Sequence, residues 1–284
     1  MSEQGYGVDS MVGTLERVAV RPPSPRGDYV VAHWAEPLDL DLLARQHADF
    51  VALLERLGCG VEVLPAEDDM PDAIFTYDPA FVVPHGVIEL RGAKQVRAGE
   101  PPLLTVQLED LGVPVVGRLL APATADGGDM FWLDRTTLAV GRGYRTNQAA
   151  IDQIREILAG VGVTVEQFDL PHDMGPEYCL HLMSVVSPVR DDLAVVYERL
   201  APVALLQALQ ARGIEMISVP EEDYASLGCN ILAVAPGVVV MAEGNEATAK
   251  ALRDHGVEVH TYAASEINKG EGGPTCLTRP IKRA

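Results

Sequence analysis

The sequence has few basic residues and few aromatic ones. Its 284 residues include 22 Lys and Arg against 41 Asp and Glu, a formal net charge of −19, and only 5% are Phe, Trp or Tyr. A nucleic-acid partner is not expected, because phosphates require clustered Lys and Arg. A negative field serves solubility, and it would also attract a small cationic substrate.

Cysteine pairs and long hydrophobic runs are missing as well. The four cysteines stand at unrelated spacings and form no Cys-x-x-Cys pair. The apolar run 231–242 is interrupted by Pro236-Gly237 and is shorter than the roughly 18 residues of a membrane span. No basic segment followed by an apolar stretch marks a signal peptide. We therefore expect a cytoplasmic protein with reduced thiols and no membrane partner, and a homodimer is compatible with the sequence.

Signatures of metal and cofactor chemistry are also absent. The sequence contains no HxxxH pattern, no GxGxxG or Walker loop and no GxSxG nucleophile elbow. Neither a metal nor a cofactor is expected.

What the sequence does contain is a unit that occurs five times: a helical stretch, a Gly, a Val-rich strand, a loop and a β-hairpin. The period is roughly 50 residues with one shorter step, which is typical of an array or propeller. The strand copies are anchored on Val61, Val113, Val163, Ile214 and Val257. Clear helical periodicity occurs in 40–57, 147–160, 202–212 and 246–255, each next to a Gly that favours a helix end.

The repeats predict an α/β fold in which one unit closes a ring. Extended pairs are expected at 73–77 with 80–83, 129–133 with 137–140, 180–186 with 192–196, and 230–235 with 237–241. The short strands 18–20 and 30–31 belong to a unit that the other terminus must complete. We expect a loose leader over 1–13 and a single domain over 14–284. Two ordinary α/β domains are the alternative, but a doubly wound fold would not insert a hairpin in every repeat.

One polar residue follows each anchor by about 16–19 residues, and a closed ring would bring these five residues to one axis. The five are Asp78, Asp129, His181, Asn230 and Cys276. Cys276 follows Gly272-Gly-Pro-Thr275, a loop whose backbone permits close approach of a ligand. His181 interrupts an apolar strand, and together with Cys276 it has the character of a general acid and base beside a nucleophile. Taken alone, each also fits a buried structural residue.

Carboxylates and two arginines complete the set of candidates. Asp126-Gly-Gly-Asp129 places two acids around a bend, which by itself is also a common polar turn. Asp78 lies in strand-like sequence, where an acid needs a partner. Arg97 and Arg145 are the basic candidates, and Asn147 or Thr146 is expected to cap the helix that follows.

In combination these motifs resemble one enzyme family. They are similar to the motifs of the guanidine-modifying enzymes, above all the dimethylarginine dimethylaminohydrolases. The matching segments are Phe75-Thr-Tyr-Asp78, Asp126-Gly-Gly-Asp129, Arg145-Thr-Asn-Gln148, His181-Leu-Met-Ser184 and Cys276-Leu-Thr278. The resemblance covers nearly the whole chain. It implies a five-bladed α/β-propeller (the pentein fold) with pseudo-fivefold ββαβ-type repeats around a central active-site channel.

The resemblance also implies a role for each matching residue. Cys276 is expected to be the nucleophile and His181 the general acid and base. Asp126 is expected to be the carboxylate that orients the histidine and contacts the substrate guanidinium. Asp78 is expected to hold the substrate guanidinium. The remaining substrate-binding candidates are Arg97 and Arg145 for an α-carboxylate, Asp72 for the α-amine, and Asp129 and Ser184.

The implied reaction is hydrolysis of an Nω-methylated arginine to citrulline and a methylamine through an S-amidino intermediate. Two departures leave alternatives open. Tyr77 stands where many relatives have an acid, and Leu182-Met-Ser184 follows the histidine in place of the His-x-Asp of arginine deiminases and amidinotransferases. Arginine deimination, amidino transfer, hydrolysis of another guanidine and non-catalytic binding of cationic amino acids are the alternatives.

Overall fold

The repeats form five small sheets of three strands each, as expected for the five-bladed α/β-propeller. The computed structural model describes residues 5–284. In each sheet the first two strands are antiparallel, and the third is parallel to the second. The sheets, in strand order, are β15 (Arg279–Arg283), β1 (Leu15–Val20) and β2 (Gly60–Val63); β3 (Ala80–Val83), β4 (Gly86–Glu89) and β5 (Val115–Arg118); β6 (Met130–Asp134), β7 (Thr137–Arg142) and β8 (Thr164–Asp169); β9 (Val186–Arg190), β10 (Leu193–Val196) and β11 (Glu215–Ser218); and β12 (Leu232–Ala235), β13 (Val238–Ala242) and β14 (Glu258–Tyr262).

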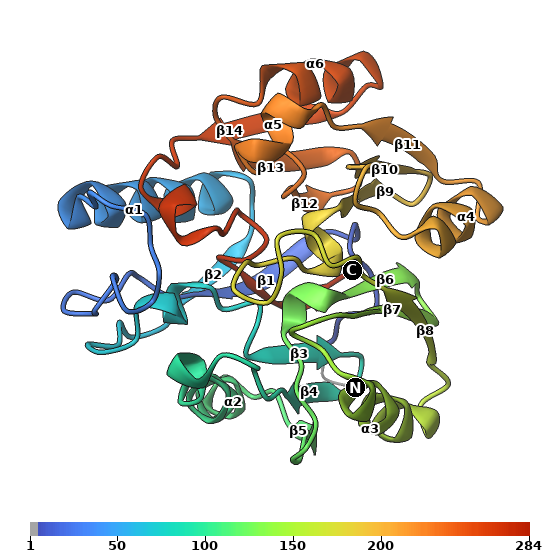
Figure 1. Ribbon diagram of the computed structural model, residues 1–284, viewed down its shortest axis with the longest axis horizontal. Helices are drawn as coiled ribbons and strands as arrows, with labels where there is room; N and C mark the ends of the chain where they lie inside the picture. The colour runs from blue at the N-terminus through green and yellow to red at the C-terminus, as the bar shows by residue number, and fades with distance from the viewer. Residues whose placement is uncertain (1–4) are drawn as a thin grey trace.

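One helix connects the second and third strands of every sheet, because parallel neighbours need a crossover connection. These helices are α1 (Leu40–Arg56), α2 (Glu100–Asp110), α3 (Gln148–Ala159), α4 (Val203–Ala211) and α6 (Glu246–Asp254). They lie on the outside of the ring of sheets (Figure 1). A short helix, α5 (Glu221–Ala225), precedes β12. No helix within residues 5–284 is both long enough and apolar enough to cross a bilayer.

The hydrophobic core lies along the inner strands. Every residue of β3 and β10 is buried, whereas the third strands, such as β2, are partly exposed between their sheet and solvent. Both faces of the first two strands of each sheet are covered, which explains why their sequences are continuous apolar runs. The ring is therefore held together by the hairpins, and the helices form an outer layer.

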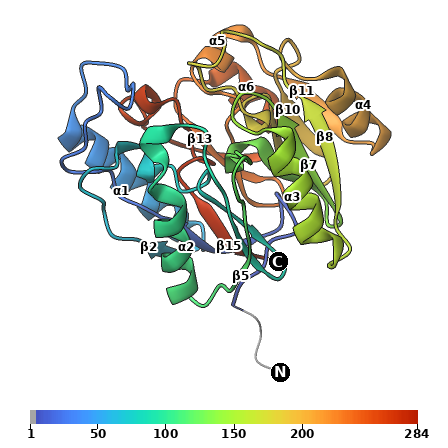
Figure 2. The ribbon, with the colours of Figure 1, turned by 60° about the horizontal axis from the view of Figure 1, so that its bottom comes forward.

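The two ends of the chain meet in one sheet, as the incomplete first unit predicted. β15 pairs with β1, with Val18 opposite Pro280 and Ala19 opposite Arg279. The loose leader expected over 1–13 is wrong for the part that the structure describes. Gly7 exchanges backbone hydrogen bonds with β15, and Val8 and Val12 are buried in the core. The expectation also covered residues 1–4, which lie outside the described residues. In Figure 2 the coloured ribbon begins at residue 5.

Local signals at the helix ends agree with the structure. The glycines Gly58, Gly112, Gly162, Gly213 and Gly256 follow the five crossover helices, and each has a φ between 70° and 88°. A positive φ is costly for other residues, which is why glycine marks these ends in the sequence. Asn147 caps α3, since its side chain accepts a hydrogen bond from Ala150 N at 3.0 Å.

Several expected strands are shorter than the apolar pattern indicated. The segment 73–77 is no strand: residues Pro71–Ile74 form a 3-10 turn, and β3 begins only at Ala80. Residues 30–31 also lie outside any strand, and Val30 and Val31 are exposed. Likewise, Leu182–Ser184 form a turn before β9. The loops before the inner strands are thus longer than predicted, and these loops carry the polar residues.

Candidate active site

The loops before β3, β6, β9, β12 and β15 surround one cavity. Its volume is about 300 Å³, and residues from all five repeats line it. Four of the five residues expected at the axis line this cavity: Asp78, His181, Asn230 and Cys276. In the remaining repeat, Gly128 lines the cavity in place of Asp129. The pseudo-fivefold arrangement therefore brings together side chains that are far apart in the sequence.

The Cys276 thiol lies at the bottom of a tight loop. Its Sγ accepts a hydrogen bond from Asn230 Nδ2 at 3.1 Å. Burial and the negative charge of Asp78 raise the pKa of the thiol to about 11, although hydrogen bonds from Gly273 and Asn230 and the charge of His181 act in the opposite direction. The thiol is therefore neutral at physiological pH.

His181 is fixed between an acid and a second thiol. Its Nε2 lies 3.2 Å from Asp126 Oδ2, and its Nδ1 lies 3.5 Å from Cys179 Sγ. Its backbone N–H donates to Ser184 Oγ at 3.0 Å. Burial opposes protonation, but Cys179, Asp78 and Asp126 together raise the pKa of His181 well above its usual range. A protonated histidine in this place is ready to donate a proton.

The Asp126-Gly-Gly-Asp129 segment has glycines because neighbours approach its backbone closely. A Cβ on Gly128 would lie 2.3 Å from His181 Nδ1, so any side chain there would displace the imidazole ring. The N–H of Gly128 donates to Asp78 Oδ1 at 3.0 Å. This segment therefore holds both the histidine and Asp78 in place.

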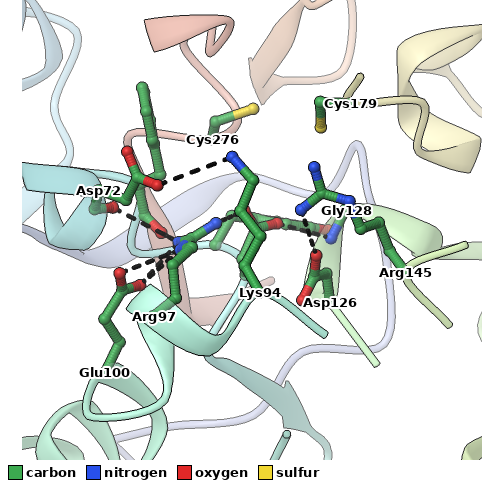
Figure 3. A network of polar contacts seen from close by, with 12 residues as sticks. Asp72, Lys94, Arg97, Glu100, Asp126, Gly128, Arg145, Cys179 and Cys276 are labelled. Atoms are coloured by element: carbon green, nitrogen blue, oxygen red, sulfur yellow. Dashed lines mark hydrogen bonds and ion pairs between the residues drawn. The ribbon is translucent and has the colours of Figure 1, made fainter. Parts of the chain in front are cut away.

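Asp78 belongs to a buried row of charges with Arg97 and Glu100. Figure 3 shows Arg97 and Glu100 side by side in this row. Arg97 Nη1 donates to Asp78 Oδ2 at 2.7 Å, and its Nε and Nη2 donate to the Glu100 carboxylate at 2.7–3.0 Å. Nη2 also donates to the carbonyl oxygens of Asp72 and Phe75. Although burial opposes ionisation, Arg97 and His181 lower the pKa of Asp78 to about 2. Asp78 is thus an anion at the cavity wall.

Two other cations, Arg145 and Lys94, also line the cavity. Arg145 Nη1 lies 3.5 Å from Asp126 Oδ2, whereas its Nη2 is buried and has no hydrogen-bond partner within residues 5–284. Lys94 Nζ lies 4.0 Å from Asp72 Oδ2, and the Lys94 side chain is partly exposed. Asp72 Oδ1 accepts from Trp34 Nε1 at 2.8 Å. Figure 3 shows Arg145 and Lys94 on different sides of the space below Cys276 and Cys179.

Asp129 is fully buried and does not line the cavity. Its Oδ1 accepts from Leu182 N at 2.9 Å and so holds the turn that follows His181. No described side chain or backbone group pairs with its Oδ2. Burial raises the pKa of Asp129 to about 6, despite the charge of His181 and the hydrogen bond from Leu182. These contacts are those of a structural residue.

Asp129→Asn should change how stability depends on pH. The folded protein binds the Asp129 proton more tightly than the unfolded chain, so this contribution to stability is present below about pH 4 and is lost as the pH rises through about 6. Asparagine keeps the acceptor for Leu182 N and carries no charge. Between about pH 4 and pH 8, urea unfolding should show the variant gaining roughly 3 kcal/mol relative to the parent protein. Equal pH dependence in the two proteins would contradict this prediction.

The candidate residues thus divide into two groups. Asp126 and Asp129 are buried and do not line the cavity. The other candidates line it: Cys276, His181, Asp78, Asp72, Arg97, Arg145 and Ser184. Sequence reasoning did not single out Lys94, Glu100 or Cys179 as site residues. The three-residue spacing of Arg97 and Glu100 at the start of a helix was the available signal for that pair.

Comparisons with known proteins agree with this architecture. An arginine deiminase family model matches residues 199–283. The N(G),N(G)-dimethylarginine dimethylaminohydrolase of Streptomyces coelicolor is 30% identical over 266 residues, which is 93% of this chain and 96% of that protein. An uncharacterised protein of Bacillus subtilis, YkgA, is 26% identical over 84% of this chain and 79% of its own length. The arginine deiminase of Listeria welshimeri is 25% identical over 76% of this chain, which spans only 63% of that enzyme.

Solved structures show the same fold at low identity. A variant of the Pseudomonas aeruginosa dimethylarginine dimethylaminohydrolase, complexed with citrulline, has a TM-score of 0.79 at 21% identity and covers 94% of this chain and 100% of its own. The N-terminal domain of the cyanobacterial arginine dihydrolase ArgZ, bound to substrate, has a TM-score of 0.82 at 21% identity, with 94% and 98% of the two chains covered.

The fold and the homologues together define a hydrolase that acts on C–N bonds of guanidines. Within that class, identity at 30% over nearly the full length of both chains decides the family. The chain belongs to the dimethylarginine dimethylaminohydrolase family.

Proposed function

We propose that this protein is a cytoplasmic enzyme that hydrolyses an Nω-methylated arginine to citrulline and a methylamine. The observation that carries the proposal is the placement of Cys276, His181 and an ionised Asp78 around one cavity of about 300 Å³. A guanidinium carbon is a poor electrophile because its charge is spread over three nitrogens. Its hydrolysis therefore requires a strong nucleophile and an anion that holds the cation in place, and this cavity supplies both.

Asp78 is the anchor for the guanidinium. Arg97 and the N–H of Gly128 fix its carboxylate, so it meets the substrate without reorganising. Asp126 lies behind His181, and its contact with the histidine supports the orienting role that the resemblance implied. The apolar side chains of Met183 and Leu227 line the same cavity and suit the methyl groups of a methylated guanidine.

The reaction begins when the Cys276 thiol releases its proton to solvent as the substrate binds, and the resulting thiolate attacks the guanidinium carbon to give a tetrahedral adduct. His181 donates a proton to the departing methylated amine, and the C–N bond breaks to leave an amidino-thioether on Cys276. Water enters, His181 removes its proton, and the oxygen adds to the same carbon. The C–S bond then breaks while the added hydroxyl group releases its proton to solvent, which gives the ureido group of citrulline and restores the thiolate.

The substrate itself promotes the first step. A thiol with a pKa of about 11 is almost entirely protonated at neutral pH. A guanidinium bound against Asp78 neutralises the negative charge that helps to keep this pKa high, and it adds a positive charge beside the sulfur. Both effects favour the thiolate when the cavity is occupied.

The amino-acid end of the substrate needs a cation for its α-carboxylate and an anion for its α-amine. The donors of Arg97 are directed at Asp78, Glu100 and backbone carbonyls, contacts that do not support its expected role as an α-carboxylate ligand. We assign the α-carboxylate to the unpartnered Nη2 of Arg145 together with Lys94, and the α-amine to Asp72.

Tyr77 stands where many relatives have an acid, but its hydroxyl does not take over a substrate contact from that acid. Its hydroxyl donates to Met130 O at 3.2 Å, and its ring lies under the guanidinium of Arg279, with Cζ 4.2 Å from the ring centroid. Both contacts direct the side chain into the protein. The choice between mono- and dimethylated substrates therefore rests with the apolar cavity wall.

Arginine deimination is the second candidate, since the arginine deiminase family model matches residues 199–283. Mass spectrometry of the purified protein with asymmetric dimethylarginine, and separately with arginine, distinguishes the two. We expect citrulline and dimethylamine from the first mixture and no citrulline from the second. Citrulline with ammonia from arginine would move the protein to the deiminases, and an amidino product formed only with an added amine would indicate transfer. Binding without loss of either compound would indicate a binding protein.

A further inference from the structure

We infer that Asn230 is a catalytic residue, whose carboxamide N–H stabilises the thiolate of Cys276. The inference deepens the proposed function, because it concerns the nucleophile of the same reaction. Asn230 Nδ2 lies 3.1 Å from Cys276 Sγ and is directed at the atom that must carry the negative charge. A hydrogen bond to an ionised acceptor is roughly twice as strong as one to a neutral acceptor, so this contact favours the thiolate over the thiol.

The orientation of the amide is fixed by a second hydrogen bond. The N–H of Thr275 donates to Asn230 Oδ1 at 3.1 Å. An N–H requires an acceptor, so the oxygen of the amide must face Thr275, and the NH₂ group must face the sulfur. Thr275 Oγ1 in turn donates to Ile231 O at 3.0 Å, which ties the cysteine loop to the loop that carries Asn230.

The loop before the cysteine is shaped around this side chain. A Cβ on Gly273 would lie 2.5 Å from Asn230 Cγ, so only glycine allows the amide to occupy its place. The backbone N–H of Asn230 donates to Leu227 O at 2.9 Å, which holds the residue at the start of β12. The amide is thus positioned before the substrate arrives, and no rotamer has to be selected during the reaction.

A neutral donor suits this cavity better than a positive one. A lysine or arginine at this position would stabilise the thiolate more strongly, but it would also repel the cationic guanidinium that Asp78 attracts. The amide of Asn230 stabilises the anion without adding charge. Its oxygen accepts a hydrogen bond from Thr275 N–H and so faces away from the sulfur.

The same hydrogen bond acts in both halves of the reaction. The sulfur is anionic before it attacks the guanidinium carbon, is a weakly accepting thioether in the covalent intermediate, and is anionic again when the C–S bond breaks. The amide therefore favours formation of the nucleophile and departure of the leaving group relative to the thioether.

The pH dependence of Cys276 alkylation tests the inference. Iodoacetamide is allowed to react with the full-length protein without substrate, and peptide mass spectrometry assigns the rate to Cys276 rather than to Cys179. In Asn230→Ala the thiol pKa should rise by about one unit or more, because one hydrogen bond to the anion is lost. Asn230→Asp should raise it further, since a carboxylate would face the sulfur. Turnover of asymmetric dimethylarginine at neutral pH should fall about tenfold or more in both.

A control variant and an alternative variant make the alkylation result interpretable. Asn268 also lines the cavity, and Asn268→Ala should leave the alkylation profile unchanged. Asn230→Asp retains an acceptor for Thr275 N–H, so it provides the measurement if Asn230→Ala does not fold. An alkylation profile that matches the parent protein in a folded Asn230 variant overturns the inference. Because alkylation needs no substrate, this result is independent of whether methylated arginine is the substrate.

Discussion

Cys276→Ser is expected to lower turnover of a methylated arginine by a factor on the order of 10⁴ or more. A serine hydroxyl fits the same loop, but it does not form an anion at neutral pH in a cavity that already holds an ionised Asp78. The covalent intermediate should disappear as well. Intact-protein mass spectrometry after rapid acid quench should detect the added amidino group on the parent protein and not on the variant.

Cys179→Ser is the matched control for this experiment. Cys179 lines the same cavity, and its Sγ contacts His181 Nδ1, but its side chain comes from the loop before β9. We expect its replacement to change turnover by less than about tenfold, because serine preserves a polar contact with the histidine. An inactive Cys179→Ser protein together with an active Cys276→Ser protein would exchange the roles of the two thiols and contradict the proposed mechanism.

The ring architecture could be predicted because its signal is repeated. One Val-rich strand after a Gly is weak evidence, but five copies with a common spacing define a closed ring and identify the strand that the other terminus must supply. The local errors have a common cause. The apolar residues of 73–77 and 180–184 were expected to form strands. They lie instead in and beside short turns that precede β3 and β9, where packing and not alternation determines the conformation.

The candidate site was predictable to the extent that it follows the ring. Cys276, His181 and Asp78 occupy equivalent places in different repeats, so the fold alone brings them together. The position of Asp129 shows the limit of that reasoning, because it is equivalent to the others but buried behind the cavity. A one-turn difference between Asp126 and Asp129 decides which acid meets the histidine, and spacing alone does not determine it.

Partners of charged residues were less accessible to sequence reasoning. Arg97 was expected to bind an α-carboxylate, but Glu100 and Asp78 occupy its guanidinium from two sides. Lys94 was not singled out from the sequence, and its Nζ lies near Asp72. Ion pairs of this kind depend on side-chain directions in loops, for which a single sequence has no periodic signal.

Asp78→Asn should produce two effects of opposite sign. Removal of the carboxylate leaves the substrate guanidinium facing Arg97 without an anion between them, so kcat/KM for a methylated arginine should fall by roughly 10³-fold. The negative charge of Asp78 also raises the thiol pKa of Cys276. Alkylation of Cys276 in the substrate-free variant should therefore be faster at neutral pH than in the parent protein.

Asp72→Asn separates this role from a general effect of lost negative charge. Asp72 lines the same cavity and carries the same charge, but it is not among the groups that raise the pKa of Cys276. We expect the Asp72 variant to show mainly a higher KM, since the α-amine takes part in binding and not in bond cleavage. Its alkylation profile should match the parent protein. If Asp78→Asn left both kcat/KM and thiol reactivity unchanged, Asp78 would not hold the guanidinium beside the nucleophile, and the reaction geometry proposed for this site would be wrong.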